Sequence, residues 1–279
     1  MTQNTLYTMK TNLFCIKEQV IVLTGGYGIL GAEMSKYLAL QGAKIVILGR
    51  NQSKGEALVE EIIENGGDAF YTQADVLDKE SLIQSREAIL AKYKKIDVLI
   101  NAAGGNMPGA TIGPDETLFD MGTSDFNKVV DLNLMGTVLP TVVFAEAMVK
   151  EKVGNIINIT SESAIRPLTR VAGYGAAKAA VSNFTQYMAG ELALKFGENF
   201  RVNALAPGFF LTDQNRSLLT NPDGSYTDRA NTILAHTPFK RFGKPEELLG
   251  AIHYLVSEAS SFVTGEILVV DGGFNAFSI

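Results

Sequence analysis

Short, continuously apolar runs alternate with longer amphipathic segments from one end of this chain to the other. Continuous runs are typical of strands that are buried on both faces, whereas a half-exposed strand would alternate apolar and polar residues. Regular alternation of such strands with helices indicates right-handed βαβ units around a parallel sheet. The sequence therefore predicts an α/β fold, with one doubly wound parallel sheet of about seven strands and helices on both of its faces.

The expected strands are residues 19–24, 43–48, 69–73, 98–101, 155–160, 201–206 and 267–270. The expected helices are residues 31–41, 55–65, 81–93, 126–150, 172–196 and 245–257. No linker rich in proline, glycine or serine divides the 279 residues, so we expect a single domain over 18–279 after an N-terminal lead-in over 1–17. Two irregular segments, 105–124 and 209–241, follow strands directly. They should overhang the sheet edge where ligands bind in such folds.

Composition narrows the class of protein. The 24 basic and 30 acidic residues give a net charge of −6, which argues against a nucleic-acid surface. No stretch approaches the roughly eighteen unbroken apolar residues of a membrane helix, and the N-terminus lacks the basic start and apolar core of a signal peptide. Cys15 is the only cysteine, which excludes intramolecular disulfides and cysteine metal sites. We expect a cytoplasmic protein with no membrane or nucleic-acid partner.

A glycine cluster follows the first expected strand. Gly25, Gly26, Gly28 and Gly31 form T-G-G-x-G-x-x-G between that strand and a helix. Glycines in this context make a tight turn, leave room for a pyrophosphate against bare backbone, and let the helix pack closely on the strand. We interpret the cluster as a dinucleotide site; the alternative is a glycine turn with no ligand.

The end of the second expected strand bears on which dinucleotide binds. The sequence there reads VILGRNQSK, with Gly49 and Arg50 where a ribose-binding carboxylate would usually stand. An arginine can meet a 2′-phosphate, which a carboxylate would repel, so NADP is slightly favoured over NAD. The alternative is that Arg50 is a solvated residue that stacks on adenine in either cofactor.

Tyr174 and Lys178 are four residues apart at the start of a strong helical pattern, which places them on one helix face. An ammonium beside a phenol favours the phenolate and should lower the pKa of the tyrosine, so that it can act as an acid or base near neutral pH. Taken alone, a tyrosine and a lysine at this spacing could equally be a surface pair.

Together with other short motifs, these residues resemble the short-chain dehydrogenase/reductase family. The motifs are ADV at 74–76, NAAG at 101–104, Ser161 thirteen residues before Tyr174, APG at 206–208, and VTGEILVVDGG at 263–273. The resemblance covers most of the chain and implies a Rossmann-fold catalytic domain with a substrate lid at about 209–241. It also implies a homotetramer, with residues 126–150 and 172–196 at one interface.

The resemblance implies roles for four catalytic residues. Tyr174 would protonate a carbonyl oxygen or deprotonate an alcohol, and Lys178 would lower the pKa of Tyr174 and hold the nicotinamide ribose. Ser161 would hydrogen-bond the substrate oxygen, and Asn133 would support a proton-relay water.

By the same resemblance, the dinucleotide would bind Thr24, Gly25, Gly26, Tyr27, Gly28, Ile29, Leu30, Gly49, Arg50, Asn51, Asp75, Val76, Asn101, Ala102, Ala103, Gly104, Tyr174, Lys178, Pro207, Gly208, Phe210 and Thr212. One residue departs from the pattern of single-domain members. Ile29 stands where their T-G-x-x-x-G-x-G loop has its middle glycine.

The overhanging segments are similar to those of the D-mannonate oxidoreductase (fructuronate reductase) group of the family, which interconverts a keto sugar acid and an aldonate. A carboxylated sugar needs a cation for its carboxylate and donors for its hydroxyls. Arg166 and Arg216 are the candidate cations, and Asn106 and Asn215 could serve the hydroxyls. The alternative is that both arginines only pin the lid.

Three other functions stay open. The chain could be a 3-oxoacyl carrier-protein reductase, a gluconate or polyol dehydrogenase, or a dinucleotide-binding redox sensor without turnover. The four filled catalytic positions favour turnover. His236 and His253 are interpreted as structural or surface residues, and we expect no catalytic metal because no histidine–carboxylate cluster has metal-ligand spacing.

Overall fold

The computed structural model describes residues 12–212 and 216–276. Seven strands form one sheet in the order β3-β2-β1-β4-β5-β6-β7, and every neighbouring pair is parallel. The strands are β1 (Val20–Thr24), β2 (Lys44–Gly49), β3 (Asp68–Gln73), β4 (Val98–Asn101), β5 (Gly154–Ile159), β6 (Phe200–Pro207) and β7 (Ile267–Val270). The predicted α/β fold with a doubly wound parallel sheet is confirmed.

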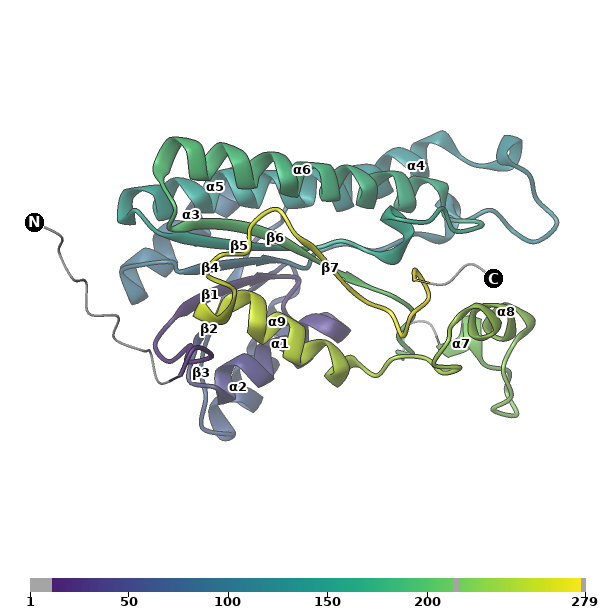
Figure 1. The fold of residues 1–279 in the computed structure, drawn as a ribbon, viewed down its shortest axis with the longest axis horizontal. Coiled ribbons are helices and arrows are strands. Elements are labelled where there is room, and N and C mark those ends of the chain that lie inside the picture. Colours follow the sequence, from purple (N-terminus) through teal and green to yellow (C-terminus); the bar gives the residue numbers. More distant parts are fainter. Residues whose placement is uncertain (1–11, 213–215, 277–279) are drawn as a thin grey trace, which may run out of the picture.

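Helices cover both faces of the sheet, with α1, α2 and α9 on one side and α3, α5 and α6 on the other (Figure 1). The α-helices are α1 (Ile29–Leu40), α2 (Gln52–Glu64), α3 (Lys79–Tyr93), α4 (Thr123–Val130), α5 (Gly136–Glu151), α6 (Ala172–Phe196), α7 (Arg216–Leu219), α8 (Asp228–His236) and α9 (Leu249–Val256). Five 3₁₀ turns are η1 (Pro108–Ala110), η2 (Leu118–Asp120), η4 (Glu162–Ala164), η5 (Pro245–Leu248) and η6 (Glu258–Ser260), while η3 (Asp131–Met135) is a π-helical turn.

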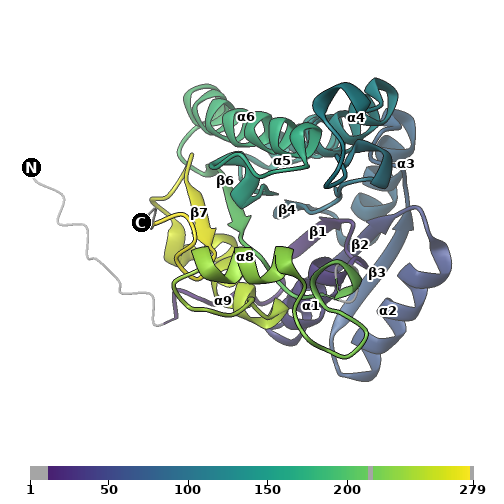
Figure 2. The ribbon, with the colours of Figure 1, turned by 90° about the vertical axis from the view of Figure 1, so that its right-hand side faces the viewer.

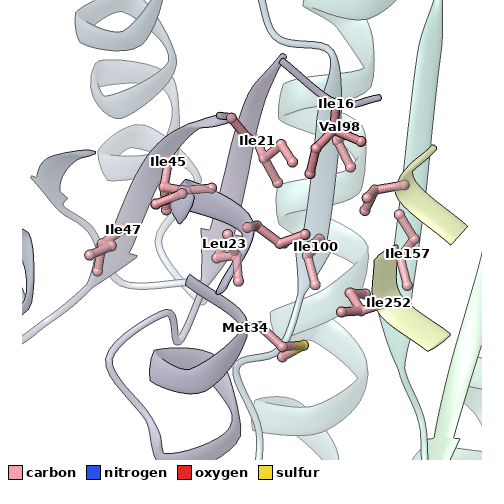
Figure 3. Packing of buried hydrophobic residues seen from close by; sticks show 14 of the residues in the cluster. Ile16, Ile21, Leu23, Met34, Ile45, Ile47, Val98, Ile100, Ile157 and Ile252 are labelled. Atoms are coloured by element: carbon pink, nitrogen blue, oxygen red, sulfur yellow. The ribbon is translucent and has the colours of Figure 1, made fainter. Parts of the chain in front are cut away.

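Each face of the sheet has its own apolar core because successive strand side chains point to opposite sides. Ile21 and Leu23 of β1 pack in one cluster, and Val20 and Val22 pack in the other. Figure 3 shows the first cluster, in which Met34 of α1 lies under the strands. All five residues of β1 are buried, as expected for a continuous apolar run in a central strand.

Ile16 belongs to the first cluster and is 1% exposed. The backbone carbonyl of Phe14 also accepts a hydrogen bond from His253 at 2.7 Å. The last part of the expected lead-in over 1–17 therefore contacts the domain through Phe14 and Ile16. Residues 1–11 of that lead-in lie outside the described residues.

The expected helix over 126–150 is part of a longer continuous unit, α4–η3–α5, which covers 123–151. By length and composition alone, this unit could cross a membrane, but 56% of its most apolar window is buried inside the protein. Packing against the sheet therefore accounts for its apolar character. The π-helical turn in the middle adds one residue to the turn, a distortion that is frequent at functional sites.

The predicted lid segment follows β6 and contains α7 and α8, which sequence patterns did not reveal. Its apolar side chains form a small separate cluster of Leu219, Ala230, Ile233 and Phe242. This cluster holds the segment together at the sheet end that Figure 2 views, where α8 lies in front of the strands.

Candidate active site

The glycine cluster forms a bare backbone surface at the end of β1. Gly25 has φ +63°, and a Cβ on it would lie 2.9 Å from the Cα of Ala103. A Cβ on Gly31 would lie 2.3 Å from the carbonyl oxygen of Gly25, so only glycine lets α1 approach the loop this closely. Gly28, the N-cap of α1, makes no side-chain capping bond, and the first turn holds no acidic residue. The free amides and helix dipole suit the pyrophosphate of a dinucleotide.

The side chain of Tyr27 covers the carboxyl end of the neighbouring strand, β2. Its hydroxyl accepts a hydrogen bond from the backbone N–H of Asn51 at 2.8 Å, and its ring lies over Gly49. Arg50 points to solvent, with 74% of its side chain exposed and Nη1 3.8 Å from the Asp75 carboxylate. The expected adenosine-end residues therefore meet at one edge, where the exposed guanidinium of Arg50 is accessible to an anion.

A chain of buried polar side chains braces the strands beneath this edge. Asn101 donates through Nδ2 to Thr141 and to Asn158, both at 2.9 Å. Thr24 accepts from the backbone N–H groups of Ala102 and Ala103 at 3.1 and 3.2 Å. These bonds tie β1, β4 and β5 together, so Asn101 braces the sheet. Val76 is buried and packs on Gly136.

Ser161, Tyr174 and Lys178 meet at the carboxyl end of β5, where the first turns of α6 cross it. The Lys178 Nζ donates to the carbonyl oxygen of Ile159 at 2.7 Å and lies 5.6 Å from the centre of the Tyr174 ring. No role was predicted for Thr160. Its hydroxyl donates a hydrogen bond to the Lys178 carbonyl at 2.9 Å and so holds α6 against the end of β5. The helical spacing therefore brings the pair together on one face, as the sequence predicts.

The Tyr174 phenol does not show the lowered pKa that the sequence suggests. Burial raises the pKa of Tyr174, and the nearby Ser161 hydroxyl opposes this only in part. Burial also lowers the pKa of Lys178 to about 8. The Lys178 ammonium donates to a backbone carbonyl rather than to the phenol, so desolvation of the phenol dominates. Tyr174 thus carries its proton at neutral pH.

Asn133 lies in the π-helical turn and is fully buried. Its amide donates to the carbonyl of Gly105 at 2.7 Å and accepts from the N–H of Gly105 at 3.1 Å. A Cβ on Gly104 would lie 2.6 Å from Asn133 Oδ1 and 3.2 Å from Lys178 Nζ. Asn133 therefore holds the backbone beside Lys178, and this close approach requires a glycine at 104.

These elements enclose a cleft of about 320 Å³. Among the sequence-predicted residues, its lining includes Gly25, Gly28, Ile29, Leu30, Ala102, Gly104, Ser161, Tyr174, Lys178, Pro207, Gly208, Phe210 and Thr212. Gly31 of the glycine cluster lines it as well. Gly105, Ile159, Thr160 and Phe209 also line it and were not predicted. The other sequence-predicted cofactor and catalytic residues are not among its lining residues. Ile29, the departure from the glycine pattern, is the first residue of α1 and is partly exposed at the cleft wall.

The predicted substrate residues do not gather in this cleft. Arg166 donates through Nε to Asn275 Oδ1 at 2.9 Å and through Nη2 to the Asn275 carbonyl at 2.5 Å. Arg166 therefore holds the C-terminal segment, whereas the alternative stated for it was that it pins the lid. Asn106 is exposed and bonds Thr111 at 2.7 Å. Arg216 begins α7 and is exposed, and Asn215 lies outside the described residues.

Glu162 follows Ser161 directly and was not predicted as a site residue. It is 1% exposed, and within the described part of the chain neither carboxyl oxygen has a hydrogen-bond partner. Burial, then the charge of Asp271, raises the pKa of Glu162 to about 7, while Arg166 acts in the opposite direction. The segment after β7 thus places the Asp271 carboxylate near the buried Glu162 carboxyl of the catalytic loop, and the two form a carboxyl pair. Only the folded contact reveals this pair, because Asp271 is remote in sequence.

Both histidines have structural contacts. His253 is buried and bonds the Tyr37 hydroxyl at 2.9 Å as well as the Phe14 carbonyl, and His236 bonds the Thr232 carbonyl within α8 at 2.8 Å. Across residues 12–212 and 216–276, no group of three or more His, Cys, Asp or Glu side chains could hold a metal ion.

Comparison with known proteins agrees with this geometry. Residues 28–275 match the model of a family described as enoyl-(acyl carrier protein) reductase. The chain belongs to the short-chain dehydrogenase/reductase family. It is 46% identical to an uncharacterised Bacillus subtilis oxidoreductase, UxuB, over 92% of this chain and 95% of that protein. It is also 38% identical to a Synechocystis 3-oxoacyl-[acyl-carrier-protein] reductase, over 93% and 98%.

Solved structures of similar proteins share the fold of this chain. A Haemophilus influenzae protein proposed to be a D-mannonate oxidoreductase, with bound NAD, is 41% identical with a TM-score of 0.89, over 96% of this chain and 99% of that one. A Burkholderia cenocepacia gluconate 5-dehydrogenase, with NADP and tartrate, is 30% identical with a TM-score of 0.84, over 95% and 98%. The chain is accordingly an NAD(P)-dependent oxidoreductase that acts on a small molecule.

Proposed function

We propose that this reductase interconverts a keto sugar acid and the corresponding aldonate, of the D-fructuronate and D-mannonate type. The observation that carries the reaction class is the meeting of Ser161, Tyr174 and Lys178 in one cleft with the glycine loop. The sugar-acid substrate is supported by similarity to the Haemophilus influenzae protein and by the polar side chains of Asn106, Asn221 and Arg229, which line a second cleft.

In this proposal, bound nicotinamide supplies or accepts the hydride. Tyr174 donates the proton that it carries at neutral pH to the carbonyl oxygen, and takes it back in the oxidation direction. Ser161 hydrogen-bonds the same oxygen, and Lys178 binds the nicotinamide ribose hydroxyls. Asn133 holds the 104–105 backbone beside Lys178 and supports a water that returns the proton to Tyr174.

The same proposal assigns the dinucleotide to the bare backbone of Gly25–Gly31 and to the cleft wall at Pro207, Gly208 and Thr212. The adenosine end lies at Gly49–Asn51 and Asp75. Arg50 favours NADP, because its exposed guanidinium can meet a 2′-phosphate.

A second candidate function is reduction of a 3-oxoacyl thioester, which the similarity to the Synechocystis reductase favours. A gluconate or other polyol dehydrogenase has similar support. A panel of D-fructuronate, 5-ketogluconate, D-mannonate, gluconate and acetoacetyl thioester, each assayed with both nicotinamide dinucleotides by absorbance, separates these functions. Turnover confined to the thioester would overturn the sugar-acid proposal.

We also propose a cytoplasmic homotetramer. Apolar side chains on the outer faces of α5 and α6 support the first interface: Val142 is 50% exposed, Tyr187 62% and Leu194 89%. A second interface would involve the edge strand β7 with its partly exposed residues. Light scattering after size-exclusion chromatography gives the mass directly, and a monomer of 30.1 kDa would contradict the proposal.

A further inference from the structure

A second cleft, of about 600 Å³, opens beside the catalytic one. It lies between the loop after β4, the residues that precede α6, and the α7–α8 segment. The two clefts are adjacent along the chain, since Gly105 lines the first and Asn106 the second, and Val171 stands three residues before Tyr174. A substrate held at Tyr174 can therefore extend into the second cleft.

Arg170 enters this cleft in a fixed position. Its backbone has φ +75°, a left-handed conformation that is strained for a residue with a side chain. Its carbonyl accepts from Ile112 N–H at 3.0 Å, and its Nε donates to the Ile112 carbonyl at 2.7 Å. The two terminal guanidinium nitrogens have no partner among the residues that the structure describes. The guanidinium is thus anchored at one edge and open at the other.

Arg229, in the first turn of α8, lines the same cleft. It makes no hydrogen bond or ion pair within residues 12–212 and 216–276. Burial lowers the pKa of Arg229, and the charge of Arg170 lowers it further. Asp228 also lines the cleft but forms no ion pair within 4.0 Å of either arginine in that part of the chain. Two partly buried cations that repel each other destabilise this cleft unless an anion lies between them.

We propose that Arg170 and Arg229 together bind the carboxylate of the substrate, while Asn106 and Asn221 on the same cleft serve its hydroxyls. This inference rests on the proposed sugar-acid function and locates its specificity. It replaces Arg166, whose guanidinium bonds Asn275, with one arginine from the residues that precede α6 and one from α8. Guanidinium groups suit this role because each can donate two parallel hydrogen bonds to a carboxylate.

The test is the Arg229→Gln variant, because Arg229 makes no hydrogen bond or ion pair within residues 12–212 and 216–276 that the substitution would break. Steady-state kinetics compare D-fructuronate with D-fructose, which has a hydroxymethyl group in place of the carboxylate. We expect KM for D-fructuronate to rise about 10- to 100-fold, the effect of losing one charged hydrogen-bond partner. The kcat should change little, and KM for D-fructose should stay the same.

Calorimetric titration of L-tartrate into the enzyme saturated with nicotinamide dinucleotide adds a readout that needs no turnover. Arg229→Gln should weaken tartrate binding by a similar factor, and Arg229→Lys should weaken it less. Lys240→Gln removes a positive charge from the lid segment outside this cleft and serves as the matched control, with no selective effect.

The outcomes separate the two proposals. D-fructuronate turnover with an unchanged KM in Arg229→Gln would overturn the arginine pair and leave the proposed function intact. If no sugar acid is turned over, the proposed function fails. In that case, weaker tartrate binding by Arg229→Gln would still support an anion site at the arginine pair. Tartrate binding that is unchanged in Arg229→Gln would overturn that site.

Discussion

The buried carboxyl of Glu162 predicts a measurable pH dependence of stability. The folded chain holds the Glu162 proton more tightly than the unfolded chain, because burial and Asp271 raise the pKa from its usual 4.5 to about 7. Between these two values the folded state binds more protons than the unfolded state. The free energy of unfolding must therefore fall as the pH rises through this window.

Linkage gives the size of the effect. For one carboxyl with these two pKa values, the free energy of unfolding falls by about 2 kcal/mol between about pH 5.5 and about pH 8.5. For a chain of 279 residues, this corresponds to roughly 3–4 °C in melting temperature. Glu162→Gln keeps the side-chain shape but removes the titrating proton, so the variant should gain this amount over the wild type across the same interval.

The assay is thermal and urea unfolding of both proteins at several pH values, at one fixed protein concentration because assembly adds to apparent stability. The difference between variant and wild type cancels the titration of all other groups. Exposed Glu60→Gln is the matched control and should follow the wild type at every pH. If the free energy of unfolding depends on pH in the same way in Glu162→Gln and in the wild type, the raised pKa of Glu162 is refuted.

Three other substitutions test the site. Tyr174→Phe should lower kcat about 100- to 10,000-fold, the usual contribution of a general acid, while calorimetry shows dinucleotide binding almost unchanged; retained turnover would contradict the role of the phenol. Arg50→Ala should raise the Kd of NADPH about tenfold more than that of NADH, and equal losses would remove Arg50 from the 2′-phosphate. Gly31→Ala should lower the free energy of unfolding by about 1–3 kcal/mol and weaken dinucleotide binding, since its Cβ would meet the Gly25 carbonyl at 2.3 Å. The matched Gly190→Ala meets nothing within 4 Å and should instead stabilise α6 by about 0.5–1 kcal/mol. A harmless Gly31→Ala would contradict the close loop–helix contact.

Local patterns predicted most of the fold. The strands over 98–101 and 267–270 and the helix over 172–196 have the predicted bounds, and the other strands differ at their ends by a residue or two. Apolar runs and helical spacing are local properties, so the sequence carries them directly. Helices α7 and α8 were not predicted because they are short and lie in a polar, irregular segment.

The site was predictable where a motif fixes the contact and unpredictable where folding creates it. Tyr174 and Lys178 share a helix face whatever surrounds them, and the structure places them together. Arg166 was predicted as a cation for the substrate carboxylate, whereas its partner Asn275 is 109 residues away and no local pattern indicates that contact. The pKa of Tyr174 was predicted in the wrong direction for the same reason, since burial depends on the whole fold.

The contact between Tyr27 and Gly49 constrains how the coenzyme preference of this enzyme could change. A Cβ on residue 49 would lie 2.4 Å from the Tyr27 ring, so a carboxylate cannot be introduced there while the tyrosine keeps its place. Since the Tyr27 hydroxyl also holds the Asn51 amide, moving the ring disturbs the start of α2. Replacement at 49 alone would damage the site before it could alter selectivity, so an evolutionary or engineered switch has to alter both positions together.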